Sequence, residues 1–338
     1  MGRYLLFVMG NSITSAYPPV SVVIPILNEA DHLQAAVDTI LSQEYLGEIE
    51  VILAIGPSRD GTEKVAEDIA RKDNRVTIVS NPSGRTPNAL NIAFAAARHD
   101  IVVRIDGHSE IAPTYIACAV ETMQRTGAVN VGGIMAAEGI TPFQKAVARA
   151  MRSVIGVGAS RFHTGGNEGA ADTVYLGTFQ KSAVRAVGGY DEEFTRAQDW
   201  EMNYRLRQAG GLVYFDPRLI VIYRPRKRIS ALAKQYFEYG RWRRAVSRRY
   251  PETVNFRYLA PPIAVVISFV SVLGSFFVPA FGAPFVMYLL SLLVGSLIIG
   301  KSWGERFRLP LVLITMHMSW GIGFLSSPRK LAQGNLST

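Results

Sequence analysis

The 338-residue sequence contains a single cysteine, Cys118. One cysteine excludes a disulfide framework and a metal site built from several cysteines, which agrees with a reducing, cytoplasmic setting for the soluble part. The sequence also lacks a Gly-x-Gly-x-x-Gly motif after its first predicted strand, which argues against a dinucleotide-binding oxidoreductase. The apolar stretch Tyr4–Met9 is too short for a usual signal peptide. We therefore expect residues 1–17 to be a disordered leader.

Positive charge is absent from most of the chain as a net quantity. The formal net charge is +9, and the segment Arg224–Arg257 alone holds eleven Lys or Arg against two Glu, which is also +9. The basicity is thus confined to residues 224–257. A basic segment suits nucleic acid or an anionic membrane surface, and its position just before a long apolar stretch favours the membrane. We expect no nucleic-acid partner.

Charged residues are also missing from two long C-terminal stretches, Tyr258–Pro279 and Phe281–Gly300. About twenty apolar residues span the hydrocarbon core, so both are predicted transmembrane helices, and Leu309–Ser327 is a plausible third. The membrane region is thus residues 258–327, followed by a tail at 328–338. Basic residues in Lys301–Arg308 and in the preceding basic segment favour the cytoplasmic side, which predicts a multi-pass inner (plasma) membrane protein with a cytoplasmic soluble domain.

The basic segment itself is predicted to form an amphipathic interfacial helix. Leu232, Tyr236, Tyr239 and Trp242 recur at three-to-four spacing between arginines. Such a helix places rings in the headgroup layer and arginines on anionic lipid, so membrane lipids are expected partners.

Residues 18–223 have the pattern of a soluble α/β domain. Short apolar runs at Val20–Pro25, Glu50–Ile55, Val76–Val79 and Ile101–Ile105 alternate with helical patterns. This alternation predicts a parallel, doubly wound sheet. Ligands in such sheets bind at the carboxyl ends of the strands.

The run that ends in IVVRIDGHSE places Asp106 and His108 at such an end. Side chains alternate along an extended segment, so both can point at one place, and Gly107 leaves room for a ligand. A carboxylate and an imidazole suit a divalent metal that bridges the protein to a diphosphate. The alternative is a polar turn in which Asp106 only caps the next segment of the chain.

Four motifs in order resemble glycosyltransferase family 2, whose members have the nucleotide-sugar-binding GT-A fold. They are VSVVIPILNEADHL from residue 20, SRDGT from residue 58, IVVRIDGHSE from residue 101, and GGYDEEF followed by QDWEMNYRLRQAG from residues 188 and 198. Within the family, VRIDGHSE, QDWE and the apolar C-terminus are most similar to the ExoA type of succinoglycan biosynthesis. The resemblance implies a GT-A domain followed by transmembrane helices.

The resemblance also implies site residues. Pro25, Asn28, Glu29 and Asp60 match the nucleotide-binding positions, and Asp106 the donor and metal position, with His108 in place of the last aspartate of the family's metal motif. Imidazole suits Mn at least as well as Mg, so a divalent metal, Mn or Mg, is the expected cofactor. The chain has Ile55 and Gly56 where acidic residues commonly hold the base, which leaves Glu29 for that task, and Gln198 stands where a glutamate is usual.

Asp199 matches the catalytic base, and Glu201, two residues on, is a candidate for orienting the acceptor. Asp172 and Tyr175 are candidates for acceptor or donor-sugar contacts, although their segment could equally be an ordinary strand. Arg85 precedes a predicted helix that starts with Thr86 as N-cap, and is a candidate phosphate contact or a solvated loop arginine. The two acids also have an alternative role as N-terminal helix charges stabilised by the dipole.

The sequence therefore predicts a membrane-attached inverting glycosyltransferase. We expect a nucleotide-sugar donor, with UDP-glucose as the leading choice from the ExoA resemblance, and a lipid-linked saccharide acceptor in surface polysaccharide or glycolipid synthesis. The alternatives are a polyprenyl-phosphate sugar synthase, whose acceptor is the polyprenyl phosphate itself, and a non-catalytic membrane adaptor that binds nucleotide without turnover.

Overall fold

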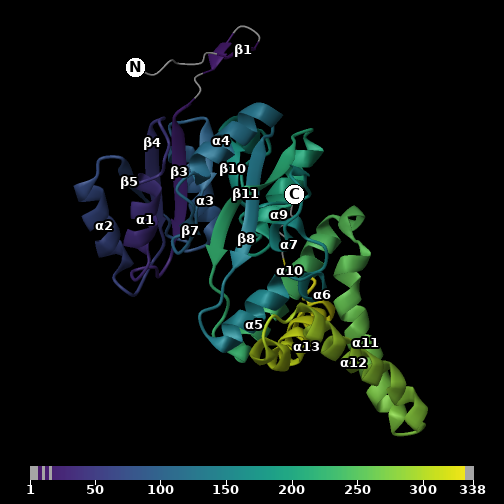
Figure 1. The fold of residues 1–338 in the computed structure, drawn as a ribbon. Helices are drawn as coiled ribbons and strands as arrows, with labels where there is room; N and C mark the ends of the chain where they lie inside the picture. The colour runs from purple at the N-terminus through teal and green to yellow at the C-terminus, as the bar shows by residue number, and fades with distance from the viewer. Residues whose placement is uncertain (1–6, 10–11, 15–16, 332–338) are drawn as a thin grey trace. The chain divides into compact units, whose positions relative to one another are not determined.

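The computed structural model describes residues 7–9, 12–14 and 17–331. The chain forms two compact units, which are described separately. The sheet unit contains the residues up to Met135 together with Gly166–Val221, and the helical unit contains Ala136–Gly165 and the residues from Ile222 onward. Figure 1 shows the course of the chain through both units.

The sheet unit is built on a nine-stranded sheet in the order β5-β4-β3-β6-β10-β8-β11-β7, with β9 paired to β11. The strands are β3 (Val20–Ile26), β4 (Ile49–Ile55), β5 (Val76–Ser80), β6 (Ile101–Arg104), β7 (Glu110–Ile111), β8 (Asn130–Ala137), β9 (Gly169–Ala170), β10 (Tyr175–Gln180) and β11 (Val213–Tyr223). Strands β5, β4, β3 and β6 are parallel, as predicted, whereas β10 runs antiparallel to both β6 and β8. The sheet is therefore mixed rather than wholly parallel.

The four parallel strands are apolar because both faces of their sheet are covered. Every residue of β4 is buried, and β3 is buried except at Pro25. The helices of this unit are α1 (Leu33–Leu41), α2 (Thr62–Lys72), α3 (Thr86–Ala96), α4 (Tyr115–Thr126), α8 (Lys181–Ala186) and α9 (Gln198–Gln208). The predicted start of α3 is off by one position, because Arg85 is the N-cap and Thr86 the first helical residue.

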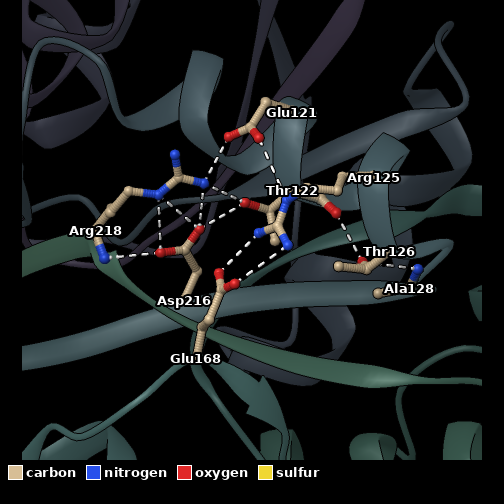
Figure 2. A network of polar contacts seen from close by, with 8 residues as sticks. All are labelled: Glu121, Thr122, Arg125, Thr126, Ala128, Glu168, Asp216 and Arg218. Atoms are coloured by element: carbon tan, nitrogen blue, oxygen red, sulfur yellow. Dashed lines mark hydrogen bonds and ion pairs between the residues drawn. The ribbon is translucent and has the colours of Figure 1, made fainter.

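A polar network fixes α4 to β11 on the antiparallel side of the sheet (Figure 2). Asp216 is fully buried and accepts hydrogen bonds from Arg218 and from the Thr122 hydroxyl. Burial alone would raise the pKa of Asp216, but these hydrogen bonds outweigh it and lower the pKa. Arg218 also pairs with Glu121 at 2.6 Å, so one guanidinium joins two carboxylates.

The helical unit contains α5 (Pro142–Met151), α6 (Val154–Val157), α7 (Arg161–Thr164), α10 (Ile229–Arg249), α11 (Phe256–Ser275), α12 (Ala283–Ile299) and α13 (Trp303–Leu325), with short 3₁₀ turns η1 (Pro251–Thr253) and η2 (Pro279–Gly282). Among the described residues, three helical stretches are long and apolar enough to cross a membrane, namely α11, η2 with α12, and α13. They correspond to the three predicted spans, with ends shifted by a few residues.

The basic segment forms helix α10, but its aromatic face is not open. Leu232, Tyr236 and Trp242 are buried in protein, and only Tyr239 of the predicted stripe is exposed. In the segment predicted as a leader, Phe7–Met9 (β1) and Ser12–Thr14 (β2) pair as antiparallel strands. The rest of the leader up to residue 16, and residues 332–338 of the predicted tail, lie outside the described residues.

Candidate active site

The register of the parallel strands brings four polar turns to one edge of the sheet. Ile26 pairs with Ile55, Ile55 pairs with Ser80, and Val23 pairs with Arg104, so the turns after β3, β4, β5 and β6 follow one another along that edge. All the predicted nucleotide and metal residues except Pro25 lie in these turns. Pro25 lies within β3, paired with Ala54.

The turns after β3 and β4 are joined by hydrogen bonds. The Asn28 backbone N–H donates to the Ser58 hydroxyl at 2.9 Å, and the Asn28 side chain accepts from the Arg59 backbone N–H at 2.9 Å. Asp60 accepts from the backbone N–H groups of Ala30 and Thr62, both at 3.1 Å. Asn28 adopts a positive φ of 56°, which asparagine tolerates better than most residues. In this structure Asn28 and Asp60 hold the turns together.

Arg85 lies in the turn after β5, at the start of α3. Its backbone is fixed by Asn81 and Ser83, and its exposed guanidinium forms no ion pair within the described residues. A fixed backbone with an unpaired planar cation beside a helix N-terminus suits a phosphate.

The centre of the site is Arg104, the last residue of β6. Its side chain is only 4% exposed, and it contacts two carboxylates, Asp106 at 3.2 Å and Asp199 through its other terminal nitrogen. Asp106 comes from the turn after β6, and Asp199 from the first turn of α9. One buried cation therefore brings together the predicted metal ligand and the predicted base, which are far apart in the sequence.

The two carboxylates differ from the guanidinium in their access to solvent. Side chains of Asp106 and Asp199 are 22% and 34% exposed, so both reach the open side of the site while Arg104 forms its floor. Desolvation raises the pKa of Asp199, the charge of Arg104 opposes that shift, and Asp106 adds to it, leaving the pKa above its ordinary value. A carboxylate with a raised pKa is a better proton acceptor once ionised.

Tyr190 closes the floor of the site beside Arg104. It is 2% exposed, and burial raises the pKa of its hydroxyl, so the phenol stays neutral. Its backbone N–H donates to Asn91 of α3 at 2.7 Å, and its carbonyl accepts from the same side chain at 2.9 Å. The GGYDEEF motif thus places a buried phenol against the Arg104 guanidinium.

His108 and Glu29 form a second pair at the rim. The His108 Nδ1 lies 2.8 Å from a Glu29 oxygen, and the Glu29 backbone N–H donates to the Thr62 hydroxyl at 2.8 Å. A carboxylate that holds one ring nitrogen fixes the orientation of a metal-binding imidazole. The structure therefore places Glu29, predicted to contact the nucleotide, in hydrogen-bonding contact with the predicted metal ligand.

The residues present fit a divalent cation that has few protein ligands. No cluster of three or more His, Cys, Asp or Glu side chains suited to a metal occurs among the described residues. Asp106 and the oriented His108 offer one oxygen and one nitrogen on the same turn, and cations that bind diphosphates often take only one or two protein ligands.

Three predicted acceptor residues take other positions. Glu201 is 1% exposed and forms a bidentate pair with Arg205, at 2.6 Å for both contacts, so it cannot reach an acceptor directly and instead fixes α9. This corrects the expected contact, because α9 turns position 201 inward. Asp172 is 79% exposed and lies 3.7 Å from Arg207. Tyr175 begins β10, where the register shifts before Thr178.

Sequence analysis missed Arg104 and Tyr190 as site residues. A signal for Arg104 was present, because a charged residue inside an apolar strand is costly to bury without a partner. Two carboxylates near strand ends could have been named as those partners. No comparable signal marked Tyr190, since an aromatic residue after two glycines occurs in many turns.

Comparison with known proteins agrees with this geometry. The family model described as "Glycosyl transferase family 2" matches residues 21–186. A succinoglycan biosynthesis protein, ExoA of Rhizobium meliloti, is 34% identical over 255 residues, covering 75% of this chain and 77% of the relative. A dolichyl N-acetyl-α-D-glucosaminyl phosphate 3-β-D-2,3-diacetamido-2,3-dideoxy-β-D-glucuronosyltransferase of Methanococcus voltae is 24% identical, covering 94% of this chain and 98% of the relative.

Among solved structures, a mannosyltransferase from Pyrobaculum calidifontis, in complex with GDP-mannose and Mn²⁺, superposes with a TM-score of 0.57. The two are 18% identical, and the match covers 89% of this chain and 86% of that one, so it shows the fold alone. The sheet unit has the GT-A fold, and the identity and coverage of the Rhizobium relative place this chain in glycosyltransferase family 2.

Proposed function

We propose that this protein transfers a sugar, with inversion, from a nucleotide diphosphate donor to a lipid-linked acceptor at the cytoplasmic face of a membrane. The observation that carries the proposal is the buried Arg104, which holds Asp106 and Asp199 at the carboxyl end of the parallel strands. That arrangement puts a proton acceptor next to a carboxylate placed to hold a metal–diphosphate group.

Asp199 is the proposed general base. It would take the proton of the acceptor hydroxyl as that oxygen attacks the anomeric carbon, while the nucleoside diphosphate leaves from the opposite face. One displacement of this kind inverts the anomeric configuration. Tyr190 and Arg104 exclude water from the inner side of the Asp199 carboxylate, and Arg104 keeps it directed at the site.

Asp106 and His108 would hold a divalent cation, which when bound offsets the negative charge of the diphosphate. Mn²⁺ in the Pyrobaculum structure and the nitrogen ligand His108 both favour Mn over Mg. Arg85 would add a fixed cation to the same phosphates. Asn28 and Asp60 support the turns against which the nucleotide binds, with Pro25 beneath them.

The choice of acceptor and pathway rests on the relatives. One relative is named for succinoglycan biosynthesis, and the other for transfer to a dolichyl-phosphate-linked sugar. Both names favour a lipid-linked saccharide acceptor over a bare polyprenyl phosphate, and the first makes UDP-glucose the leading donor. Three apolar helices would keep the enzyme where such acceptors reside.

A donor screen tests the proposal. The full chain in lipid nanodiscs, with Mn²⁺ and a lipid extract from its own cells, is offered UDP- and GDP-sugars with Asp199→Asn as control. We expect transfer from one donor, lost in the control, with a lipid-linked oligosaccharide as product and the opposite anomeric configuration. A monosaccharide on a lipid phosphate would support the synthase. Binding of UDP without transfer from any donor would support the adaptor.

A further inference from the structure

The starting observation is the position of the two ends of α13 relative to the hairpin of α11 and α12. These two helices run antiparallel and meet at η2, where the Ser271 hydroxyl donates to the Phe281 carbonyl and accepts from the Phe285 N–H. The η2 turn is therefore the far end of the hairpin. The near end consists of the start of α11 and the end of α12.

Helix α13 begins at the near end. Only three residues separate it from α12, and the Arg306 side chain donates to the Gly300 carbonyl at 3.1 Å. At the same end of α13, Arg149 of α5 lies 3.5 Å from Glu305.

Helix α13 also ends near the same place. Gly321 packs so closely on α11 that a Cβ there would lie 2.5 Å from the Pro261 carbonyl oxygen. Pro261 lies only about 8 Å along α11 from Phe256, at about 1.5 Å per residue. Had α13 crossed the bilayer beside the hairpin, Gly321 would lie about 27 Å from Trp303 and level with Gly274 at the far end.

The partner of the C-terminal half of α13 is a charged helix. A Cβ on Gly240 of α10 would lie 1.9 Å from the Trp320 carbonyl oxygen, so the two backbones are in direct contact. Arg248 of α10 donates to the carbonyls of Ser327 at 2.9 Å and Pro328 at 2.7 Å, just beyond α13. A helix with this many arginines belongs at the membrane surface rather than in the hydrocarbon core.

The charges just beyond α13 agree with this placement. Arg329 and Lys330 come directly after the helix. A third crossing would carry them to the side opposite the other basic segments, contrary to the usual distribution of Lys and Arg in short loops. If α13 returns to its starting side, all the basic segments lie on one side.

The surface of α13 has two apolar faces with different surroundings. Leu309, Val312, Leu313 and Met316 are fully buried in protein. The opposite face is exposed and consists of Trp303, Phe307 and Leu311 in the first half and Ile322 and Leu325 in the second, with exposures from 47% to 87%. Figure 1 shows α13 beside α5, while the α11–α12 hairpin extends away from them.

We propose that α13 is an interfacial helix whose exposed face enters the lipid at the boundary between headgroups and acyl chains. The chain then crosses the membrane twice, with α11 and α12, and its C-terminal end stays on the side where α11 begins. The enzyme has a helical platform of α5, α10 and α13 at that surface. This proposal is independent of the sugar-transfer reaction.

Cysteine labelling tests the proposal on the full chain in intact cells. Cys118 is replaced by Ser, and single cysteines are introduced by Lys227→Cys before α10, Ala280→Cys in η2 and Lys330→Cys after α13; all three positions are exposed. A membrane-impermeant maleimide is applied before and after permeabilisation. We expect Lys330→Cys to label together with Lys227→Cys, and Ala280→Cys to label on the opposite side.

Labelling of Lys330→Cys together with Ala280→Cys would show a third crossing and overturn the proposal, as would finding all three positions on one side. Protease protection of a C-terminal epitope on the chain without these substitutions gives a second measurement. The epitope is expected to be protected or cleaved together with the loop before α10.

Discussion

The substitution Arg104→Met removes the cation between Asp106 and Asp199 while keeping an unbranched side chain of similar length. Arg104 is 4% exposed, and the two carboxylates it contacts are 22% and 34% exposed. Without it, two acids from separate elements face each other with no charge between them. We expect Asp199 to move away from the productive direction, and its carboxyl to protonate more readily.

The size of the effect can be worked out from the exposures. Breaking one side of a fully buried ion pair costs about 3–5 kcal/mol, and an exposed pair is worth about 0–1 kcal/mol. Because the carboxylates are partly solvated, we expect a loss of about 2 kcal/mol in the free energy of unfolding. A base displaced by about 1 Å loses about 10²-fold in rate, so kcat should fall about a hundredfold.

The pH dependence gives a specific sign. Asp199 must be ionised to accept a proton, so activity falls as the pH drops through its pKa. Arg104 opposes the upward shift of that pKa in the wild type, so Arg104→Met raises the Asp199 pKa further. The acid limb of the kcat profile should therefore move to higher pH, measured with a labelled nucleotide sugar and the protein in nanodiscs.

Two comparisons make the test decisive. Arg218→Met breaks a similar contact of one guanidinium with two carboxylates, Asp216 and Glu121, away from the site (Figure 2). It should lower stability and leave kcat and the acid limb unchanged. In the Asp199→Asn background, Arg104→Met should cost little further activity. Retention of wild-type kcat in Arg104→Met, or full additivity with Asp199→Asn, would refute the positioning role.

Three further predictions concern the base, the metal and the helical unit. Asp199→Asn alone should lower kcat by about two to four orders of magnitude and leave UDP affinity within a fewfold, as checked by kinetics and calorimetry. Glu29→Gln should raise the Mn²⁺ concentration needed for half-maximal transfer about 10- to 100-fold through His108, and an unchanged requirement would contradict that role. Gly240→Val should separate α10 from Trp320 and lower the midpoint of thermal unfolding in nanodiscs, whereas the exposed Lys227→Ala should not.

Much of the sheet unit could be predicted from the sequence. The four parallel strands were found within one or two residues, because continuous apolar runs bounded by turn residues leave few alternatives. The antiparallel strands β8, β10 and β11 were not predicted as such, since their pairings join segments far apart in the chain. The mixed sheet could not be derived from local periodicity alone.

For the site, the resemblance named the residues but not their contacts. Asp106 and Asp199 were placed in the right region, yet the cation that joins them was overlooked. Glu201 was assigned outward because two acids at i and i+2 of a helix start were treated alike. Positions two apart on a helix point in different directions, so one carboxylate lies in the site and the other is buried against Arg205.

The hydrogen bonds between Asn28, Ser58, Asp60 and the neighbouring backbone have a consequence for ligand affinity. Loops that are already locked lose little conformational freedom when a nucleotide arrives, so the free energy gained from its contacts appears almost fully as binding. Asp60→Ala should thus weaken nucleotide binding mainly through an entropic penalty that calorimetry resolves. The rim of this pocket is built before its guest.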